Sequence, residues 1–187
     1  RKKLVEHALT NACNALARRL AEQESQIRLL EELAQRLELE GRLDRVEIYD
    51  NSHIQGDNAV GGMVVAGPSG FVKNAYRKFN IRSENAATSR SKRSRGGDDY
   101  EMMREVLKRR FARVLKNDPV RRSGQWPDLV ILDGGKGQLS VAKEVLGELG
   151  IQDVPLLAIS KGPDRHAGRE QFHMPGKASF IMPSRDP

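Results

Sequence analysis

Residues 128–138 read Asp-Leu-Val-Ile-Leu-Asp-Gly-Gly-Lys-Gly-Gln, and this stretch decides the fold. The run from Leu129 to Leu132 is short, continuously apolar and flanked by carboxylates. Such a run is typical of a central strand that is buried on both faces of a sheet. A tight turn is expected over 134–137 and a helix over 138–149, where apolar residues recur at helical spacing. The turn lacks the spacing of a Walker A loop, which argues against an NTPase of that class.

Upstream, the apolar pattern takes the period of a β-strand from residue 45 onward. Residues 45–50 alternate and are β-branched, so they predict a first strand. Residues 60–66 predict a second strand, and a Gly-Pro-Ser-Gly turn follows at 67–70. Residues 71–80 predict a third strand. Three strands with tight connections indicate an antiparallel meander.

A basic loop and a helix separate this meander from the central strand. Residues 83–97 are polar and basic without apolar periodicity, which favours a loop. Asp98 and Asp99 are typical of a helix start. The helix that follows is expected to bury Met103, Val106, Leu107, Phe111, Val114 and Leu115. With a last apolar strand at 155–160, the order β-β-β-α-β-α-β predicts an α/β fold with a mixed sheet flanked by helices.

The chain begins with a separate helical segment, 1–41. Its apolar residues recur at helical spacing but fade over 22–26, so a kink or two helices are expected there, with Gly41 as the stop. We interpret the segment as a linker or packing helix; the alternative is a partner-binding coiled coil. The remainder, 45–187, is expected to form one domain, with a hairpin considered for its tail.

Composition limits the partner and the compartment. The 187 residues carry 32 Lys and Arg against 25 Asp and Glu, a formal net charge of +7, which indicates a polyanionic partner such as nucleic acid. No apolar run reaches the length of about 18 residues that a transmembrane helix needs. A single cysteine, Cys13, excludes a disulfide framework and a cysteine zinc site, so a cytoplasmic location is expected. The missing Met at the start predicts a piece of a longer protein.

Two carboxylates end apolar strands, Asp50 and Asp133. If these two strands are parallel neighbours, both side chains converge on one crevice, and Asp99 could join them. Oxygen ligands of this kind suit Mg²⁺ or Mn²⁺. A metal beside a basic groove is what phosphodiester hydrolysis requires. The alternative is that each strand-end Asp only caps a turn.

Other candidate residues are a histidine and several cations. His53 could bind a phosphate or act as a general acid, although a lone histidine is more often structural. Lys136 in the Gly-rich turn could contact a phosphate. No metal is assigned to His166 or His173. The loop cations predicted to hold a nucleic-acid backbone are Arg90, Lys92, Arg93 and Arg95.

Five motifs occur together and in a fixed order. They are Asp-Asn-Ser-His-Ile-Gln-Gly (50–56), Tyr-Arg-Lys-Phe-Asn-Ile (76–81), Gly-Asp-Asp-Tyr (97–100), Leu-Asp-Gly-Gly-Lys-Gly-Gln (132–138) and Ser-Lys-Gly (160–162). The set closely resembles the C-terminal endonuclease domain of UvrC, the component of the UvrABC excinuclease that cuts DNA in bacterial nucleotide excision repair.

This resemblance implies a ribonuclease H-like fold for residues 45–187 and a metal-dependent 5′ incision beside a lesion in double-stranded DNA. The implied catalytic carboxylates are Asp50 and Asp133, which would hold Mg²⁺ or Mn²⁺, with Asp99 at a further acidic position. Lys136 and Lys161 would contact phosphate. The implied protein partner is UvrB, with UvrA acting upstream.

The chain also departs from this family. A catalytic histidine of the family lies in a motif beyond residue 187, and neither His166 nor His173 stands in that context. The resemblance also implies a following helix-hairpin-helix region and a preceding nuclease domain for the 3′ incision, and neither is expected within these 187 residues. One alternative is therefore a folded but catalytically incomplete module that binds DNA or a partner. Another is a different ribonuclease H-like nuclease acting on hybrids or junctions.

Overall fold

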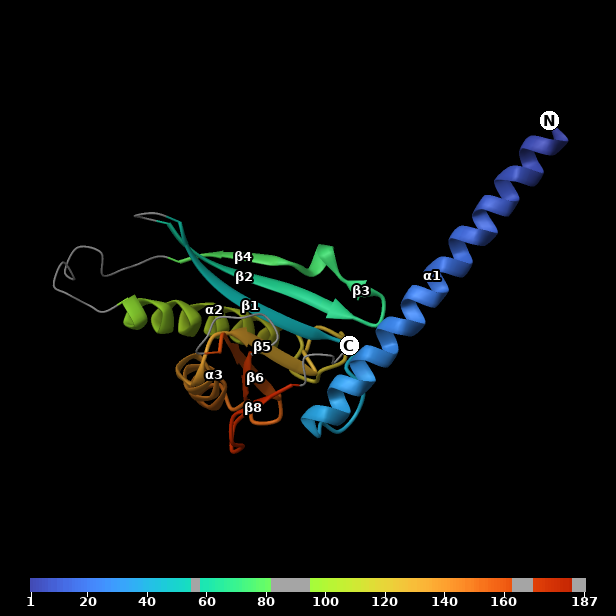
Figure 1. Cartoon of the computed structure of the whole chain (residues 1–187). Helices are drawn as coiled ribbons and strands as arrows, with labels where there is room; N and C mark the ends of the chain where they lie inside the picture. The colour runs from blue at the N-terminus through green and yellow to red at the C-terminus, as the bar shows by residue number, and fades with distance from the viewer. Residues whose placement is uncertain (55–57, 82–94, 163–169, 183–187) are drawn as a thin grey trace.

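The computed structural model describes residues 1–54, 58–81, 95–162 and 170–182. Over these residues the chain forms one mixed sheet with helices against it and a long helix at the N-terminus (Figure 1). In chain order the elements are α1 (Lys2–Leu37), β1 (Val46–Ile54), β2 (Asn58–Gly67), β3 (Gly70–Phe71), the 3-10 helix η1 (Lys73–Ala75), β4 (Arg77–Asn80), α2 (Arg95–Asn117), β5 (Leu129–Asp133), α3 (Lys136–Glu148), β6 (Leu156–Ser160), β7 (Gln171–His173) and β8 (Phe180–Ile181).

The pairing of the strands confirms the predicted mixed sheet. In the described residues the strand order is β3-β2-β1-β5-β6-β7-β8, and β4 also pairs with β2. β1 is antiparallel to β2 but parallel to β5, and β5 is parallel to β6. β7 is antiparallel to both β6 and β8, so the tail does form a hairpin. The first strand and the apolar strand at 129–133 are therefore parallel neighbours.

The predicted third strand, 71–80, is wrong as a single element. It is divided into β3 and β4 by η1. The Val72 amide donates to the Val65 carbonyl at 2.8 Å, and the chain then turns before β4 pairs with β2. Val72 and Ala75 both pack against the core. A helical turn brings two residues three apart to one side, which continuous alternation would not do.

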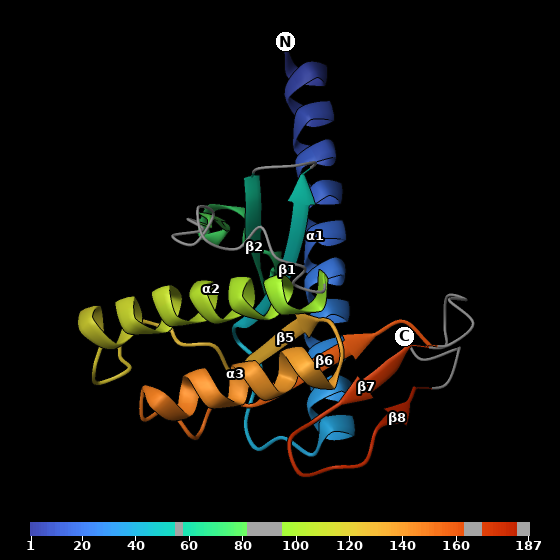
Figure 2. The ribbon, with the colours of Figure 1, turned by 90° about the vertical axis from the view of Figure 1, so that its left-hand side faces the viewer.

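The core has two layers, one on each face of the sheet. On one face α2 and α3 lie side by side, and the last turns of α1 cross the other face (Figure 2). β5 is buried from both sides. Val130 and Leu132 belong to the layer under α2 and α3, whereas Leu129 packs with α1. The prediction of a central strand at this position is confirmed.

The helix α1 is continuous, so the kink expected over 22–26 is absent. It ends at Leu37, and Gly41 is not its stop. Glu38 adopts the left-handed conformation instead (φ 56°), and the Leu39 amide donates to the Ala34 carbonyl at 2.9 Å. Only the C-terminal part of α1 packs on the sheet, while its N-terminal part projects outward (Figure 1). None of the helices in the described residues is long and apolar enough to cross a membrane.

Two helix starts differ from prediction. α2 begins at Arg95, not at Asp98, so Arg95 lies in the helix and not in the basic loop. α3 begins at Lys136, so the turn expected over 134–137 is shortened to its two glycines. The Gln138 side chain accepts a hydrogen bond from the Gly135 amide at 3.0 Å, which supports the earlier start. The expected buried face of α2 is confirmed, with Leu115 partly buried.

Candidate active site

The register of β1 and β5 brings two carboxylates together. The paired positions run from Val46 and Leu129 to Tyr49 and Leu132. One step further along both strands come Asp50 and Asp133, both exposed. Adjacent strands lie about 4.8 Å apart, and matching positions of parallel strands point to the same face. The two carboxylates therefore lie next to each other.

Alternation along the strands decides on which face this pair lies. Tyr49 and Leu132 are buried in the layer under α2 and α3, whereas Ile48 and Ile131 pack on the α1 side. Asp50 and Asp133 consequently face the α1 side of the sheet. Asp50 was predicted to end its strand, which is wrong. β1 continues to Ile54 because its pairing with β2 extends to Ile54 and Asn58.

Asp99 is half-buried near the start of α2, at the same end of the sheet. Its backbone carbonyl accepts a hydrogen bond from the Asn51 side-chain amide at 3.4 Å. Asn51 follows Asp50 and faces α2, since a Cβ on its partner Gly61 would meet both Asn51 and Val106. In the part of the chain whose side chains are described, no three His, Cys, Asp or Glu residues gather around a possible metal position. The structure thus groups Asp50 with Asp133, and Asn51 ties the start of α2 to the same strand.

A buried histidine of β7, His173, contacts Ser160 at the carboxyl end of β6. His173 Nε2 lies 2.9 Å from Ser160 Oγ, and its Nδ1 lies 2.7 Å from Ser179 Oγ. Burial lowers the pKa of His173, and the positive charge of Lys136 lowers it further. The lysine therefore belongs to the electrostatic environment of this cluster. Ser160 is one residue beyond Ile159, which pairs with Asp133.

Sequence spacing could not reveal this cluster. Its residues meet through the antiparallel pairing of β6 with β7, in which Ser160 is opposite Gln171 and Ala158 is opposite His173. The short alternating run at 171–173 was the available signal, and it predicts only a strand.

The remaining predicted residues divide into three groups. Lys136 and Lys161 are exposed at the edge where β5 and β6 end. His53 lies in β1 and Arg95 in α2, but their side chains are outside the described part. Arg90, Lys92, Arg93 and His166 lie outside the described residues.

The fold and this pair of carboxylates define a domain of the ribonuclease H class. The chain belongs to the family described as "UvrC RNAse H endonuclease domain", which it matches over residues 34–187.

Relatives of this chain are named UvrABC system protein C. The UvrABC system protein C of Rhodospirillum rubrum is 59% identical over 187 residues, which is all of this chain and 28% of that protein. The UvrABC system protein C of Paramagnetospirillum magneticum is 56% identical over 187 residues, again all of this chain and 29% of that protein. The chain thus spans less than a third of the length of these relatives.

Among solved structures, a Ciona intestinalis Endonuclease V in complex with a 24mer DNA has a TM-score of 0.45 and 15% identity. The match covers 78% of this chain and 59% of that one.

Proposed function

We propose that this chain is the DNA endonuclease domain that makes the 5′ incision beside a lesion in bacterial nucleotide excision repair. Its family supports nuclease chemistry, and the in-register pair of Asp50 and Asp133 supports the position of the active site. This pair is the observation that carries the proposal, because two exposed carboxylates side by side repel each other unless a cation lies between them.

We further propose that the pair holds Mg²⁺ or Mn²⁺. The donor set fits, since Mg²⁺ is commonly bound by one or two carboxylates and completes its shell with water and substrate phosphate. When bound, such a cation would lower the pKa of a water molecule and offset phosphate charge.

The cations of the chain would then position the substrate. Lys136 and Lys161 are exposed at the end of β5 and β6, where a phosphate beside Asp133 would lie. Arg90, Lys92, Arg93 and Arg95 are proposed to hold the backbone, and Asp99 and His53 to support the site. Contacts to phosphates carry no sequence information. We therefore propose that UvrB selects the lesion and that UvrA acts before it. The reaction would take place in the cytoplasm.

The test uses a chimera in which this chain replaces the matching 187 residues of the Rhodospirillum rubrum protein. The Rhodospirillum rubrum protein supplies the rest of the full-length sequence. This chimera is assayed with UvrA, UvrB, Mg²⁺ and a duplex that carries one lesion. Asp50→Asn and Asp133→Asn should each remove the 5′ incision while DNA binding and the 3′ incision remain.

Two results would replace the proposal. An unchanged 5′ incision in both variants would leave the chain as a module that binds DNA or a partner. A stronger cleavage of an RNA–DNA hybrid than of the damaged duplex, lost in the same variants, would indicate a different ribonuclease H-like nuclease.

A further inference from the structure

A basic groove lies between the C-terminal half of α2 and the strand β4. Its volume is about 640 Å³, and no acidic side chain lines it in the described part of the chain. The groove is lined by five arginines: Arg45, Arg77, Arg109, Arg110 and Arg113. We refer to it as the arginine groove.

The arginine groove lies on the face of the sheet opposite the two carboxylates. Met63 and Phe79 line it, and both pack with the core layer under α2 and α3. Asp50 and Asp133 face the α1 side, as the alternation of their strands shows. The groove is therefore separate from the proposed active site.

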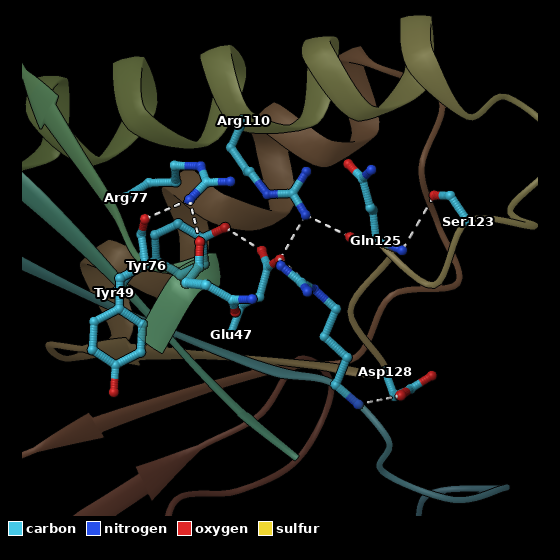
Figure 3. Close-up of polar contacts among 10 residues, drawn as sticks. Glu47, Tyr49, Tyr76, Arg77, Arg110, Ser123, Gln125 and Asp128 are labelled. Carbon is cyan, nitrogen blue, oxygen red and sulfur yellow. Dashed lines mark hydrogen bonds and ion pairs between the residues drawn. The ribbon is translucent and has the colours of Figure 1, made fainter. Parts of the chain in front are cut away.

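A buried carboxylate fixes one wall of the groove (Figure 3). Glu47 is fully buried, and its Oε1 accepts from Arg45 at 2.7 Å and from Arg110 at 2.6 Å. Tyr49 donates its hydroxyl to Oε2 at 2.6 Å. Arg110 also donates to the Gln125 carbonyl. These bonds hold both guanidinium groups in place before any ligand arrives.

The other three arginines have less negative charge to neutralise them. Arg109 pairs with Glu105 at 2.9 Å and lies 5.7 Å from the centre of the Phe79 ring. Within the described ranges, Arg77 donates to the backbone carbonyls of Asn74 and Tyr76, and Arg113 is exposed. In the residues that the structure describes, two carboxylates thus pair with three of the five guanidinium groups, which leaves an excess of three positive charges along the groove.

The lining indicates the class of ligand. Guanidinium groups bind phosphate through two parallel hydrogen bonds, and groups that are already fixed lose little entropy on binding. A protein partner would need an exposed apolar or aromatic anchor. The apolar lining residues, Met63, Ala75 and Phe79, are buried or half-buried.

We propose that the arginine groove binds the phosphodiester backbone of a nucleic acid, as a second contact on the face of the sheet opposite Asp50 and Asp133. This site does not depend on nuclease activity. It would hold a stretch of nucleic acid other than the phosphate next to the carboxylates.

The test measures binding of the 187-residue chain to a labelled DNA duplex by fluorescence anisotropy over a series of salt concentrations. EDTA is present, so that no divalent cation contributes. The groove variant combines Arg77→Gln with Arg113→Gln, because neither side chain pairs with a carboxylate in the described residues. The control combines Lys3→Gln with Arg19→Gln, which removes the same charge from the exposed part of α1.

The groove variant should bind on the order of tenfold more weakly, and the slope of log K against log salt should fall by about 1.8, for two phosphate contacts at about 0.9 each. The control should keep the wild-type slope. A second variant, Arg77→Lys with Arg113→Lys, should keep most of the slope because the charges remain. This variant also separates loss of charge from loss of folding.

Two outcomes would overturn the proposal. Equal weakening by the groove variant and the control would mean that only the net charge matters. Tighter binding of a polyglutamate peptide than of DNA, with the same loss in the groove variant, would indicate an acidic protein segment as the ligand.

Discussion

Asp50 and Asp133 occupy matching positions on two parallel strands, one step beyond the paired residues Tyr49 and Leu132. Both are exposed, and no other strand separates them. Like charges at such positions destabilise a sheet by a few tenths of a kcal/mol to about 1 kcal/mol. The pair is therefore expected to destabilise the folded chain in the absence of a cation, and under the proposed function it is where a cation would bind.

The first prediction follows from this cost. Without a divalent cation, Asp50→Asn should raise the free energy of unfolding by a few tenths of a kcal/mol up to about 1 kcal/mol, because one of two adjacent charges is removed. With Mn²⁺, the order should reverse, since only the wild type gains stability by binding. Thermal unfolding with EDTA and with Mn²⁺ measures both effects, and Asp133→Asn should behave alike.

A matched control is Asp153→Asn, a carboxylate at the other end of the domain that pairs with Arg121. It should not change the response to Mn²⁺. A gain in stability with Mn²⁺ that persists in both Asp50→Asn and Asp133→Asn would contradict this assignment of the metal site.

The second prediction concerns the buried carboxylate of Glu47. In Glu47→Gln the guanidinium groups of Arg45 and Arg110 lose their shared charge partner in a buried position. Breaking a buried ion pair from one side costs about 3–5 kcal/mol, so a loss near the lower end is expected. Tyr49 remains a donor in this variant, because burial by itself raises the pKa of its hydroxyl. Urea unfolding measures the loss.

Glu22→Gln is the control for this change. Glu22 pairs with Arg18 on the exposed part of α1, where both side chains are mostly in water. Such a pair contributes at most about 1 kcal/mol. Equal losses in the two variants would show that burial of Glu47 does not decide its contribution.

The sequence could predict the pair of Asp50 and Asp133 but not the burial of Glu47. The short apolar run from Leu129 to Leu132, flanked by carboxylates, predicts a buried strand. A parallel neighbour then suffices to bring Asp50 and Asp133 together. Glu47 stands at an alternating position, where a polar residue is normally expected to face water. Its burial depends on Arg110, 63 positions further along the chain. Contacts of this kind are set by the packing of α2 on the sheet and leave no local pattern.

The division of the predicted third strand has the same origin. Residues 71–80 carry strand-forming residues, but the packing of Val72 and Ala75 on the core imposes a turn of 3-10 helix. The end of α1 at Glu38 is a further case. A non-glycine residue in the left-handed conformation is uncommon, and here an ion pair between Glu38 and Lys177 at 2.6 Å lies beside it. Lys177 is far from Glu38 in sequence, so the local pattern at the helix end could not predict this ion pair.

The third prediction is a dependence of stability on pH. The pKa of folded His173 lies below its ordinary value of 6.5, because the ring is buried and Lys136 is near. As the pH falls below about 6.5, the unfolded chain takes up this proton first, so the folded state loses stability. The loss is limited to about 1.4 kcal/mol per pH unit for one proton. Urea unfolding at pH 8, 7, 6 and 5 should therefore show the stability advantage of the wild type over His173→Gln shrink as the pH falls.

Lys136→Gln gives the companion measurement. Removing the positive charge should bring the pKa of His173 closer to its ordinary value and so reduce the loss of stability at low pH. An advantage of the wild type over His173→Gln that is the same at every pH would show that the folded state does not disfavour the charged ring.

The fourth prediction compares two neighbouring glycines of β2. A Cβ at Gly61 would overlap the side chain of Val106, which is fully buried in α2, and would lie 3.2 Å from Asn51 Oδ1. Since Val106 has no free space to move into, Gly61→Ala should lower the free energy of unfolding by about 1–3 kcal/mol. Gly62→Ala should cost little, because its Cβ would face the other side of the sheet and meet only the Asp50 carbonyl at 3.7 Å. Urea unfolding of the two variants gives the comparison, and similar losses in both would mean that α2 is free to shift away from β2.

A shift of α2 away from β2 would also move Asp99, because the carbonyl of Asp99 accepts a hydrogen bond from Asn51. In the chimera, Gly61→Ala should therefore slow the 5′ incision more than Gly62→Ala does.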